Sequence, residues 1–564
     1  MSRSNKGTIT KMLSIQLAGI FWCLRINVVS SLETVAQFPK QNCSMLQVKT
    51  YADMILIRNC SLKTLPNAVF LSHATSTSLN IYDTDLETIE DFAFNGLKRL
   101  EIVSIHRTHL TEIHSWCEHD LTHLHLLDLQ RNNIQTIHAT ALQHYPNLET
   151  INLSINNLSN IPKNVFKYTD QVRHVNLARN HIRRVEGYTF KELSELTHIS
   201  LEHNDIDFVD SFAFVSNVRL KSIRLDFNKI LIFDTLVLFN CQQLAYVNLS
   251  YNALTKINDY TFERNSELSV MDISGNEIKE FEKNSFSGLS NLQIFNASNN
   301  LLVNLNRNAF HDFVNLKLFD VSSNKLTHLV DGTLKYLSSV EHINLSHNAI
   351  EEIETNVFSA MASLQTVDLS YNKLSSDSFL DEMVALKTLV MSFNQFDFLN
   401  LSKLVDVDEV DVIGNPWNCT WLVGEMMSFS NGVRFGENFS IETEEQVLTV
   451  PGIDCIDHSG NKRSIVMLQQ SNVRRMENKL NEVPAYEEQN KLIKRMLENE
   501  FGYKACLMWT AIAVFIVFGV VHFGRVVLKK SEKQSERFRL SQQVSLITTT
   551  TPTTANSDKF SNSK

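Results

Sequence analysis

Clustered histidines are the first residues of this sequence that could do chemistry, because imidazole binds zinc and titrates near neutral pH. A zinc site needs three or four ligands that converge on one point. Placed on the repeat described below, these histidines scatter over strand, turn and outer positions, so we predict no metal site and leave open a pH-dependent surface. The cluster comprises His106, His109, His114, His119, His123, His125, His138 and His144.

The sequence lacks the motifs that organise common enzyme active sites. It contains no G-x-S-x-G, no phosphate-binding glycine loop and no H-E-x-x-H. Only 16 of the 564 residues are glycine, which leaves little irregular backbone for a catalytic loop. We therefore expect no catalytic residue, no cofactor and no enzymatic activity. A net charge of -10 gives no basic surface, so we also expect no nucleic-acid partner.

An internal repeat with a strict period of 24 dominates the chain, in the pattern L-x-x-L-x-L-x-x-N-x-L. Thr108, Thr84 and Cys60 continue the asparagine column toward the N-terminus, and Asn394 and Asn415 continue it forward in shorter units. About 15 to 16 units then cover residues 50–415. The strictly spaced asparagines are Asn132, Asn156, Asn180, Asn204, Asn228, Asn252, Asn276, Asn300, Asn324, Asn348 and Asn372.

The residue types in each column predict how one unit folds. In L-x-L the two apolar residues point inward and the central residue points outward, so each unit should give one short strand, stacked in parallel on the next. The inward asparagine can satisfy backbone groups where the chain turns off the strand. A second column, ten positions after the asparagine, should fill the outer side with rings. Its members are Phe166, Phe190, Phe214, Phe262, Phe286, Phe310 and Phe358.

These units resemble the typical extracellular leucine-rich repeat over about two thirds of the chain. The resemblance implies an α/β solenoid: a leucine-rich-repeat horseshoe with a concave parallel β-sheet and with irregular or 3₁₀ segments on the convex side. Because the end units of a solenoid expose core, both ends need caps. An N-terminal cap is expected at residues 32–62 and a C-terminal cap at residues 415–460.

The same resemblance implies one disulfide in each cap. Cys43 and Cys60 should bridge the N-terminal cap. In the C-terminal cap Trp421 stands where the second cysteine of the usual C-x-C pair would be, so the single bridge Cys419–Cys455 is expected.

Three further cysteines are expected to have other roles. Cys117 and Cys241 lie about five repeats apart, or roughly 24 Å at about 4.8 Å per strand, which is too far for a disulfide. Cys241 falls in an apolar column, so we expect a buried free thiol. Cys117 is either buried and free or paired with another chain, and acylation of Cys506 stays open.

Both ends of the chain indicate a plasma-membrane protein with an extracellular N-terminus and a cytoplasmic C-terminus. Residues 1–31 have the basic, apolar and small-residue order of a signal peptide. Residues 505–528 predict a transmembrane helix, and the lysines that begin the tail 529–564 favour a cytoplasmic side. Residues 463–504 predict a helical juxtamembrane stalk, with a short partner-binding coil as the alternative.

Glycosylation sequons suggest where a ligand could bind. Asn152, Asn248, Asn296 and Asn344 occupy the outward position of L-x-L, so their glycans would project from the concave sheet. We therefore expect the ligand in the sequon-free window between Asn157 and Asn248, or on a flank of the solenoid; the alternative is that the outward residues of this window are ordinary solvated strand residues. Outward residues of that window are His174, Asn176, His198, Ser200, Glu202, Arg224 and Asp226. The ten sequons are Asn42, Asn59, Asn152, Asn157, Asn248, Asn296, Asn344, Asn400, Asn418 and Asn438.

The caps give a narrower resemblance, to the leucine-rich-repeat immune proteins of mosquitoes in a membrane-anchored form. It rests on the Cys43/Cys60 cap running into Leu62-Lys63-Thr64-Leu65-Pro66, and on the segment Asn415–Leu422. It implies a single-pass receptor or co-receptor in innate immune recognition, with an extracellular protein or glycan ligand, and with a sister repeat protein or a complement-like factor as a partner. A cell-adhesion or neuronal-guidance protein, or a constitutive scaffold, is the alternative.

Overall fold

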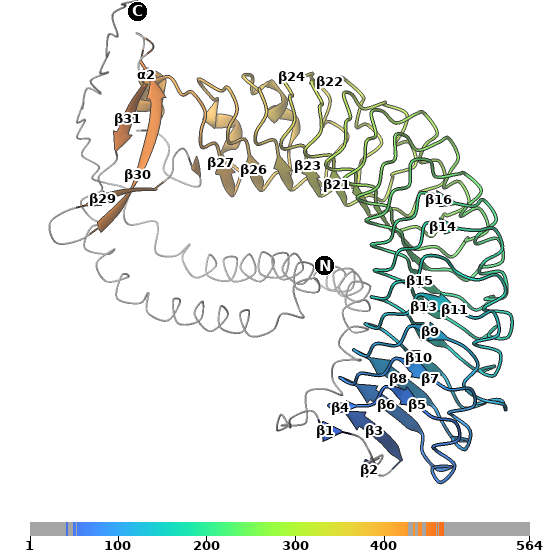
Figure 1. Ribbon diagram of the computed structural model, residues 1–564. Coiled ribbons are helices and arrows are strands. Elements are labelled where there is room, and N and C mark those ends of the chain that lie inside the picture. Colours follow the sequence, from blue (N-terminus) through green and yellow to red (C-terminus); the bar gives the residue numbers. More distant parts are fainter. Residues whose placement is uncertain are drawn as a thin grey trace, which may run out of the picture. The chain divides into compact units, whose positions relative to one another are not determined.

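A computed structural model describes residues 41–42, 49–51, 53–426, 433–434, 438–442, 447–457, 460 and 462–466 of the chain. The chain divides into two compact units. The first comprises Met1–Asn348 with Ile353–Leu364, and the second comprises Ala349–Glu352 with Gln365–Lys564. Each unit is built from repeats that contribute one inner strand apiece (Figure 1).

The inner strands of the first unit form a parallel sheet that lines the concave side of an arc (Figure 1). Neighbouring strands pair exactly one repeat apart, as His174 does with His198. The strand β2 differs, since it is antiparallel to its neighbour β3. The strands are β2 (Lys49–Tyr51), β3 (Met54–Arg58), β6 (Ser78–Tyr82), β8 (Ile102–His106), β10 (Leu126–Asp128), β12 (Thr150–Asn152), β13 (His174–Asn176), β15 (His198–Ser200), β17 (Ser222–Arg224), β18 (Tyr246–Asn248), β19 (Val270–Asp272), β20 (Ile294–Asn296), β21 (Leu318–Asp320) and β23 (His342–Asn344).

Short strands also lie on the outer side of the repeats, where the rest of the chain forms turns. The aligned pairs are β5 (Thr64–Leu65) with β7 (Thr88–Ile89), β9 (Glu112–Ile113) with β11 (Thr136–Ile137), and β14 (Arg184–Val185) with β16 (Phe208–Val209). Further short strands are β22 (His328–Leu329), β24 (Glu352–Ile353), and the pair β1 (Gln41–Asn42) and β4 (Cys60–Ser61).

The second unit continues the repeat and ends in a cap. Its parallel strands are β25 (Thr366–Asp368), β26 (Thr388–Val390), β27 (Glu409–Asp411) and β28 (Val433–Arg434), with 3₁₀ helices η1 (Ser378–Glu382) and η2 (Leu401–Leu404). The cap contains α2 (Cys419–Met426) and the antiparallel strands β29 (Asn438–Glu442), β30 (Val447–Ile456) and β31 (Lys462–Val466). Within the described ranges, α2 is the one α-helix.

The asparagine column holds adjacent repeats together, as its inward position predicts. The amide nitrogen of Asn276 donates to Leu249 O and Ile273 O, at 3.0 and 2.9 Å, and its Oδ1 accepts from Leu254 N. One side chain thus satisfies backbone groups of two repeats, which is why a buried amide is tolerated there. The phenylalanine column is confirmed as core: Phe190, Phe214 and Phe262 are fully buried.

The C-terminal cap contains the predicted single disulfide. Cys419 in α2 bonds to Cys455 in β30, with Cα atoms 5.0 Å apart. Trp421, which replaces the second cysteine of the usual pair, stacks on the buried Trp417 with ring centroids 5.2 Å apart. Ring packing therefore occupies the place of the second bridge. Cys43, and with it the predicted Cys43–Cys60 bridge, lies outside the described residues.

One predicted boundary is wrong. Residues 463–466, assigned to the start of the helical stalk, belong to β31, where Ile465 pairs with Ile453 of β30. The β-branched pair Ile465 and Val466 favours this extension of the cap. The remainder of the stalk, the signal peptide at 1–31, the membrane span at 505–528 and the tail lie outside the described residues. No helix within the described ranges is long and apolar enough to cross a membrane.

Two cysteines of the repeats are free and buried, as predicted for Cys241 and as one of the alternatives for Cys117. Burial raises the pKa of each thiol to about 12. Cys241 lies against the carbonyl of Phe214, one repeat earlier. Both thiols are therefore part of the core.

Candidate functional site

A regular polar ladder completes most of the inner face of the sheet. The Asp or Asn in the outward position of L-x-L accepts the backbone N–H of a serine two positions later in the same repeat. Asp272 Oδ1 accepts from Ser274 N at 2.9 Å. We call this pattern the Asx–Ser ladder; its members in the first unit are Asn152–Ser154, Asn248–Ser250, Asp272–Ser274, Asn296–Ser298, Asp320–Ser322 and Asn344–Ser346.

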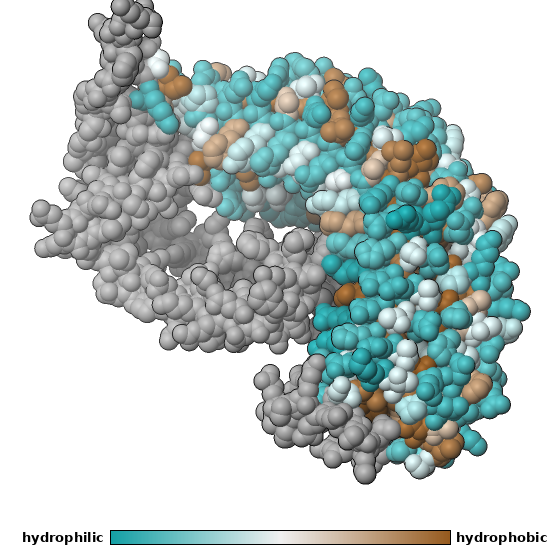
Figure 2. All heavy atoms as spheres, in the orientation of Figure 1, coloured by the Kyte–Doolittle hydropathy of each residue, from teal (hydrophilic) through white to brown (hydrophobic). Residues whose placement is uncertain are grey.

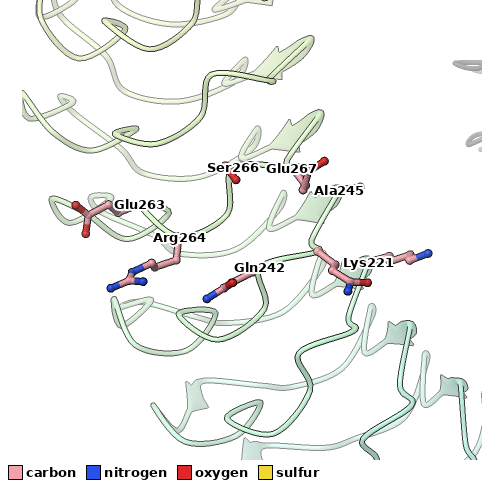
Figure 3. A pocket seen from close by; sticks show the side chains of 8 residues that line it. Lys221, Gln242, Ala245, Glu263, Arg264, Ser266 and Glu267 are labelled. Carbon is pink, nitrogen blue, oxygen red and sulfur yellow. The ribbon is translucent and has the colours of Figure 1, made fainter.

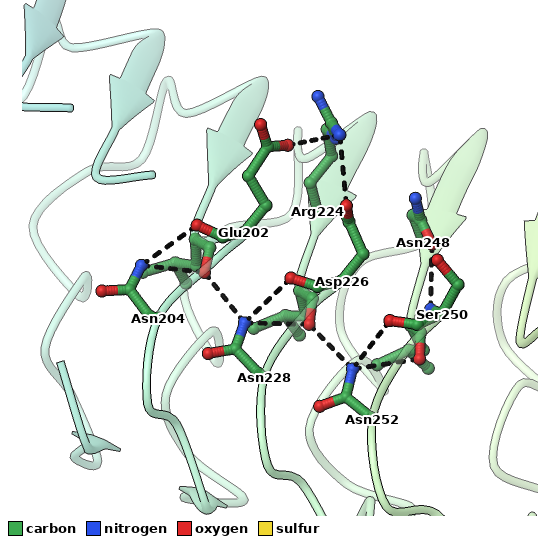
Figure 4. A network of polar contacts seen from close by, with 11 residues as sticks. Glu202, Asn204, Arg224, Asp226, Asn228, Asn248, Ser250 and Asn252 are labelled. Atoms are coloured by element: carbon green, nitrogen blue, oxygen red, sulfur yellow. Dashed lines mark hydrogen bonds and ion pairs between the residues drawn. The ribbon is translucent and has the colours of Figure 1, made fainter. Parts of the chain in front are cut away.

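The Asx–Ser ladder is interrupted at β15 and β17. Glu202 and Asp226 stand where the ladder has serine, and Arg224 stands where it has Asp or Asn. Arg224 pairs with Glu202 at 2.5 Å and with Asp226 at 3.2 Å. Figure 4 shows the guanidinium reaching both carboxylates from two adjacent repeats. We call Glu202, Arg224 and Asp226 the charged triad. Ion pairs between their side chains take the place of the hydrogen bonds that the ladder makes from a backbone N–H to a side-chain oxygen.

The charged triad is deeply placed. Asp226 is 0% exposed, and its Oδ1 has no hydrogen-bond partner among the described residues, although its Oδ2 pairs with Arg224. Burial raises the pKa of Glu202 to about 7 and also raises the pKa of Asp226, while Arg224 acts in the opposite direction on both. A buried acceptor without a donor carries a desolvation cost. Because Asp226 is fully buried, the groups of the triad that a ligand can contact are Arg224 and Glu202, whose side chains are 32% and 15% exposed.

Two histidines extend this surface along the same strands. His174 and His198 occupy paired positions on β13 and β15, and their rings stack with centroids 5.0 Å apart. Burial lowers the pKa of both, that of His198 to about 4, so both rings are neutral at physiological pH. Asn176 and Ser200 pair in register beside them.

All seven predicted ligand-binding residues thus lie on or directly after β13, β15 and β17. The structure brings Glu202, Arg224 and Asp226 into one cluster and His174 and His198 into another. Asn176 is already engaged, because its Oδ1 accepts from Ala178 N. The columns of the repeat identified the residues but not the clusters; the sequence signal for the charged cluster is a charged residue in place of serine in two consecutive repeats, at Glu202 and Asp226.

The sequence analysis missed an aromatic stack at the edge of the same surface. His203, Phe227 and Tyr251 each precede the repeat asparagine, and their rings stack with centroids 4.2 and 4.4 Å apart. The stack ends at Gly275, where a Cβ would lie 2.8 Å from the Tyr251 ring and where φ is +64°. Tyr251 is 47% exposed. The sequence signal for this stack is an aromatic residue at the same position of consecutive repeats.

Two of the sequons on the inner face are buried. Asn152 is 2% exposed and Asn248 is 1% exposed, whereas Asn296 and Asn344 are half-buried. Both buried side chains turn back to accept the N–H of the following serine of the Asx–Ser ladder. An outward position in this sheet is therefore not always an accessible one. Glycan occupancy at all ten sequons stays a prediction.

The clustered histidines are spread over separate contacts. His114 lies 2.7 Å from Asp91, His144 lies 2.9 Å from Asp120, and His106 stacks on Tyr82. In the part of the chain that the structure describes, no group of three or more His, Cys, Asp or Glu side chains is placed to hold a metal ion.

A polar hollow lies on the flank before β18. It is lined by Lys221, Gln242, Gln243, Ala245, Glu263, Arg264, Ser266 and Glu267 (Figure 3). Figure 3 shows these side chains spread over successive turns. The lining mixes both charges with amides and has no deep apolar wall, unlike a typical small-molecule site. We therefore place the candidate site on the inner face.

Comparison with known proteins identifies the repeat. The family model described as "Leucine rich repeat" matches residues 122–182, 170–230, 242–302, 292–350, 314–374 and 343–396. No curated protein sequence matches the chain.

Several solved structures share the fold. A leucine-rich-repeat protein of Leptospira interrogans has a TM-score of 0.57 at 21% identity, covering 71% of this chain and 100% of its own. The leucine-rich repeat domain of the mosquito protein APL1 has a TM-score of 0.54 at 16% identity, covering 72% and 97%. The mosquito LRIM1/APL1C complex gives 0.54 at 16% identity, covering 90% and 84%. The matched repeats at residues 122–230 and 242–396, together with the parallel sheet and its asparagine column, show that this chain contains a leucine-rich-repeat solenoid.

Proposed function

We propose that this chain is a single-pass cell-surface receptor or co-receptor of innate immunity, which binds an extracellular protein or glycan ligand on the inner face of β13, β15 and β17. The observation that carries the binding proposal is the charged triad. Buried ion pairs are often no more stabilising than the neutral residues that could replace them. The asparagine members of the Asx–Ser ladder, such as Asn248–Ser250 and Asn296–Ser298, show that this fold has such a neutral alternative in other repeats.

The surroundings of the charged triad fit recognition of a protein. Arg224 and Glu202 offer partly exposed charged groups, and the edge of the aromatic stack offers apolar area beside them. Aromatic residues next to desolvated polar groups are typical of the centre of protein interfaces. The immune role is supported by the resemblance of the caps to mosquito immune proteins, and the membrane anchor by the apolar run from Ala505 to Gly524.

A reversal of the interruption tests the binding proposal. The triple variant Glu202→Ser, Arg224→Asn, Asp226→Ser gives the β17 repeat the Asn–Ser pair of the ladder and the β15 repeat its serine, so the chain should still fold and reach the cell surface. Full-length wild type and variant would be cross-linked gently on their native cells, recovered, and compared by mass spectrometry. We expect the variant to lose the wild-type ligand at least tenfold. The matched control removes an ion pair elsewhere, with Lys317→Ala and Glu341→Ala.

The identity of the recovered proteins separates the candidate functions. Complement-like factors, microbial components or sister repeat proteins would support the immune receptor. Recovery of neuronal or muscle surface proteins alone, with aggregation of transfected cells, would replace it by the adhesion alternative. A ligand that the triple variant retains in full would move the binding site away from the charged triad.

The topology is tested separately with two epitope tags on the full-length chain. A tag placed after residue 31 should bind antibody on intact cells, and a tag after Lys564 should bind only after permeabilisation. The reverse pattern, or secretion of the intact chain, would contradict the membrane anchor.

A further inference from the structure

Large apolar side chains gather on the outer side of four consecutive repeats. Tyr188, Phe212, Leu236 and Tyr260 occupy the same position of their repeats, and each is about half exposed. The rings of Tyr188 and Phe212 stack in parallel, with centroids 5.6 Å apart. The same position is polar on both sides of this stretch, where it holds Thr140, Asn164, Asn284 and Asn308.

A second stripe lies beside the first. Phe208 and Ile232 precede Phe212 and Leu236 by four positions, a length of chain that spans at most about 14 Å. We call these two stripes the outer patch, defined by Tyr188, Phe208, Phe212, Ile232, Leu236 and Tyr260. Figure 2 shows hydrophobic side chains gathered on the outer side near β16.

Leu231 and Phe239 extend the outer patch, and arginines border it. Arg184 lies over the ring of Phe208 at 4.2 Å, and Arg264 lies over the ring of Phe239 at 4.9 Å. Exposed aromatic residues accompanied by arginine are the composition of protein interfaces rather than of ordinary surface.

The summed exposed area of these side chains is comparable with one side of a standard interface. The eight side chains are between 38% and 64% exposed. With about 200 Å² for a fully exposed large side chain, they present roughly 800 Å² to solvent. The largest apolar patch of a typical monomer is about 300 to 600 Å². One side of a standard interface buries about 800 Å².

We propose that the outer patch is the interface between two copies of this chain. A two-fold axis brings the same surface of both copies together in opposite directions. The first stripe suits such an axis, because its order Tyr–Phe–Leu–Tyr has similar residues at equal distances from its centre. The axis passes between Phe212 and Leu236, which places Phe212 opposite Leu236 of the second copy and Tyr188 opposite Tyr260 of the second copy.

The surroundings leave this surface accessible. No sequon lies between Asn157 and Asn248, and Asn248 is on the inner sheet. The outer patch and the charged triad are on opposite sides of the same repeats, so a dimer keeps both ligand surfaces free. The dimer proposal therefore does not depend on the proposed ligand site.

Cysteine cross-linking tests the arrangement in the full-length chain on cells. One tagged copy carries Phe212→Cys and a differently tagged copy carries Leu236→Cys, and the two are co-expressed and treated with a short bismaleimide. We expect a dimer that contains both tags. The control pair, Val303→Cys with Val314→Cys, uses exposed positions outside the outer patch and should give at least tenfold less dimer. Cys117 and Cys241 are buried, so these two thiols contribute little background.

Charge insertion gives an independent measurement. Phe212→Glu and Leu236→Glu should each reduce co-precipitation of two tagged copies at least tenfold, and Val303→Glu should not. Surface expression and the thermal unfolding midpoint control for folding, because all three positions are about half exposed. Absence of the cross-link together with unchanged co-precipitation would overturn the proposal, as would a cross-link only to a different protein.

Discussion

The polar side chains of β15 and β17 on the inner face bond differently from those of β19, β20 and β21. In the later strands, Asp272, Asn296 and Asp320 each accept the N–H of a serine of their own repeat. In β15 and β17, Arg224 instead pairs with Asp226 of its own repeat and with Glu202 of the preceding one, and one buried acceptor has no donor from the described part of the chain. The later repeats therefore show that the solenoid can fold without a charged triad.

Removal of the arginine should have the largest effect on stability. Arg224→Ala leaves Glu202 and Asp226 buried without a cation, and breaking a buried ion pair in this way costs about 3 to 5 kcal/mol. Ser274→Ala, in the regular ladder, keeps the backbone bond to Asp272 and should cost less than about 1 kcal/mol. Urea unfolding at neutral pH measures both. Equal costs would show that the two regions are not energetically distinct.

The asparagine column should be equally important in both regions. Asn204→Ala and Asn276→Ala each remove bonds to three carbonyls and one N–H, which leaves buried backbone groups unsatisfied at a cost of about 3 kcal/mol. The exposed Asn133→Ala is the control. A clear difference between the first two urea midpoints would mean that the contrast between the regions extends to the backbone framework.

A buried carboxylate outside the charged triad should give a pH-dependent penalty. Burial raises the pKa of Asp128 from 3.8 to about 6, so the native state binds its proton more tightly than the unfolded state. The stability from this group is present below about pH 4 and is lost as pH rises through 6. Between about pH 4 and pH 7, the free energy of unfolding of Asp128→Asn should therefore rise relative to that of wild type, by about 2 kcal/mol.

Unfolding midpoints at pH 4, 5, 6 and 7 measure this difference. The exposed Asp331→Asn should show no such trend. A constant difference between Asp128→Asn and wild type at all four pH values would contradict the buried-carboxylate explanation.

An exposed ion pair in the sequon-free window between Asn157 and Asn248 should have the smallest effect on stability. Lys229 Nζ lies 2.6 Å from Asp205 Oδ1, and these side chains are 66% and 33% exposed. Such pairs contribute about 0.5 kcal/mol or less, so Lys229→Ala should barely move the urea midpoint. A loss as large as that of Arg224→Ala would show that burial is not what sets the charged triad apart.

The sequence predicted the parts of the fold that depend on one repeat at a time. The asparagine column, the phenylalanine column and the parallel strands follow from the recurrence of the same residue types once per repeat, since each position does the same task in every unit. The single bridge of the C-terminal cap followed from Trp421 in place of a cysteine. The end of the cap was missed because residues 463–466 are too few to show a strand pattern beside a charged segment.

The parts that depend on several repeats at once were not predictable from the pattern. Alternation along a strand placed Asn152 and Asn248 outward correctly, but neighbouring strands about 4.8 Å away and the following serine bury them. The ion pairs of Arg224 and the stack of Phe227 on Tyr251 depend on side-chain length across adjacent repeats. Column analysis identified the residues, and only the structure supplied their partners.

The two buried thiols can report local opening of the solenoid. Only a thiolate reacts readily with alkylating reagents, and burial disfavours that form in both Cys117 and Cys241. Because stability in a repeat protein is a sum of neighbouring terms, distant repeats can fray at different rates. The alkylation rates of the two cysteines would therefore time the opening of the early repeats against that of the central ones, without any engineered probe.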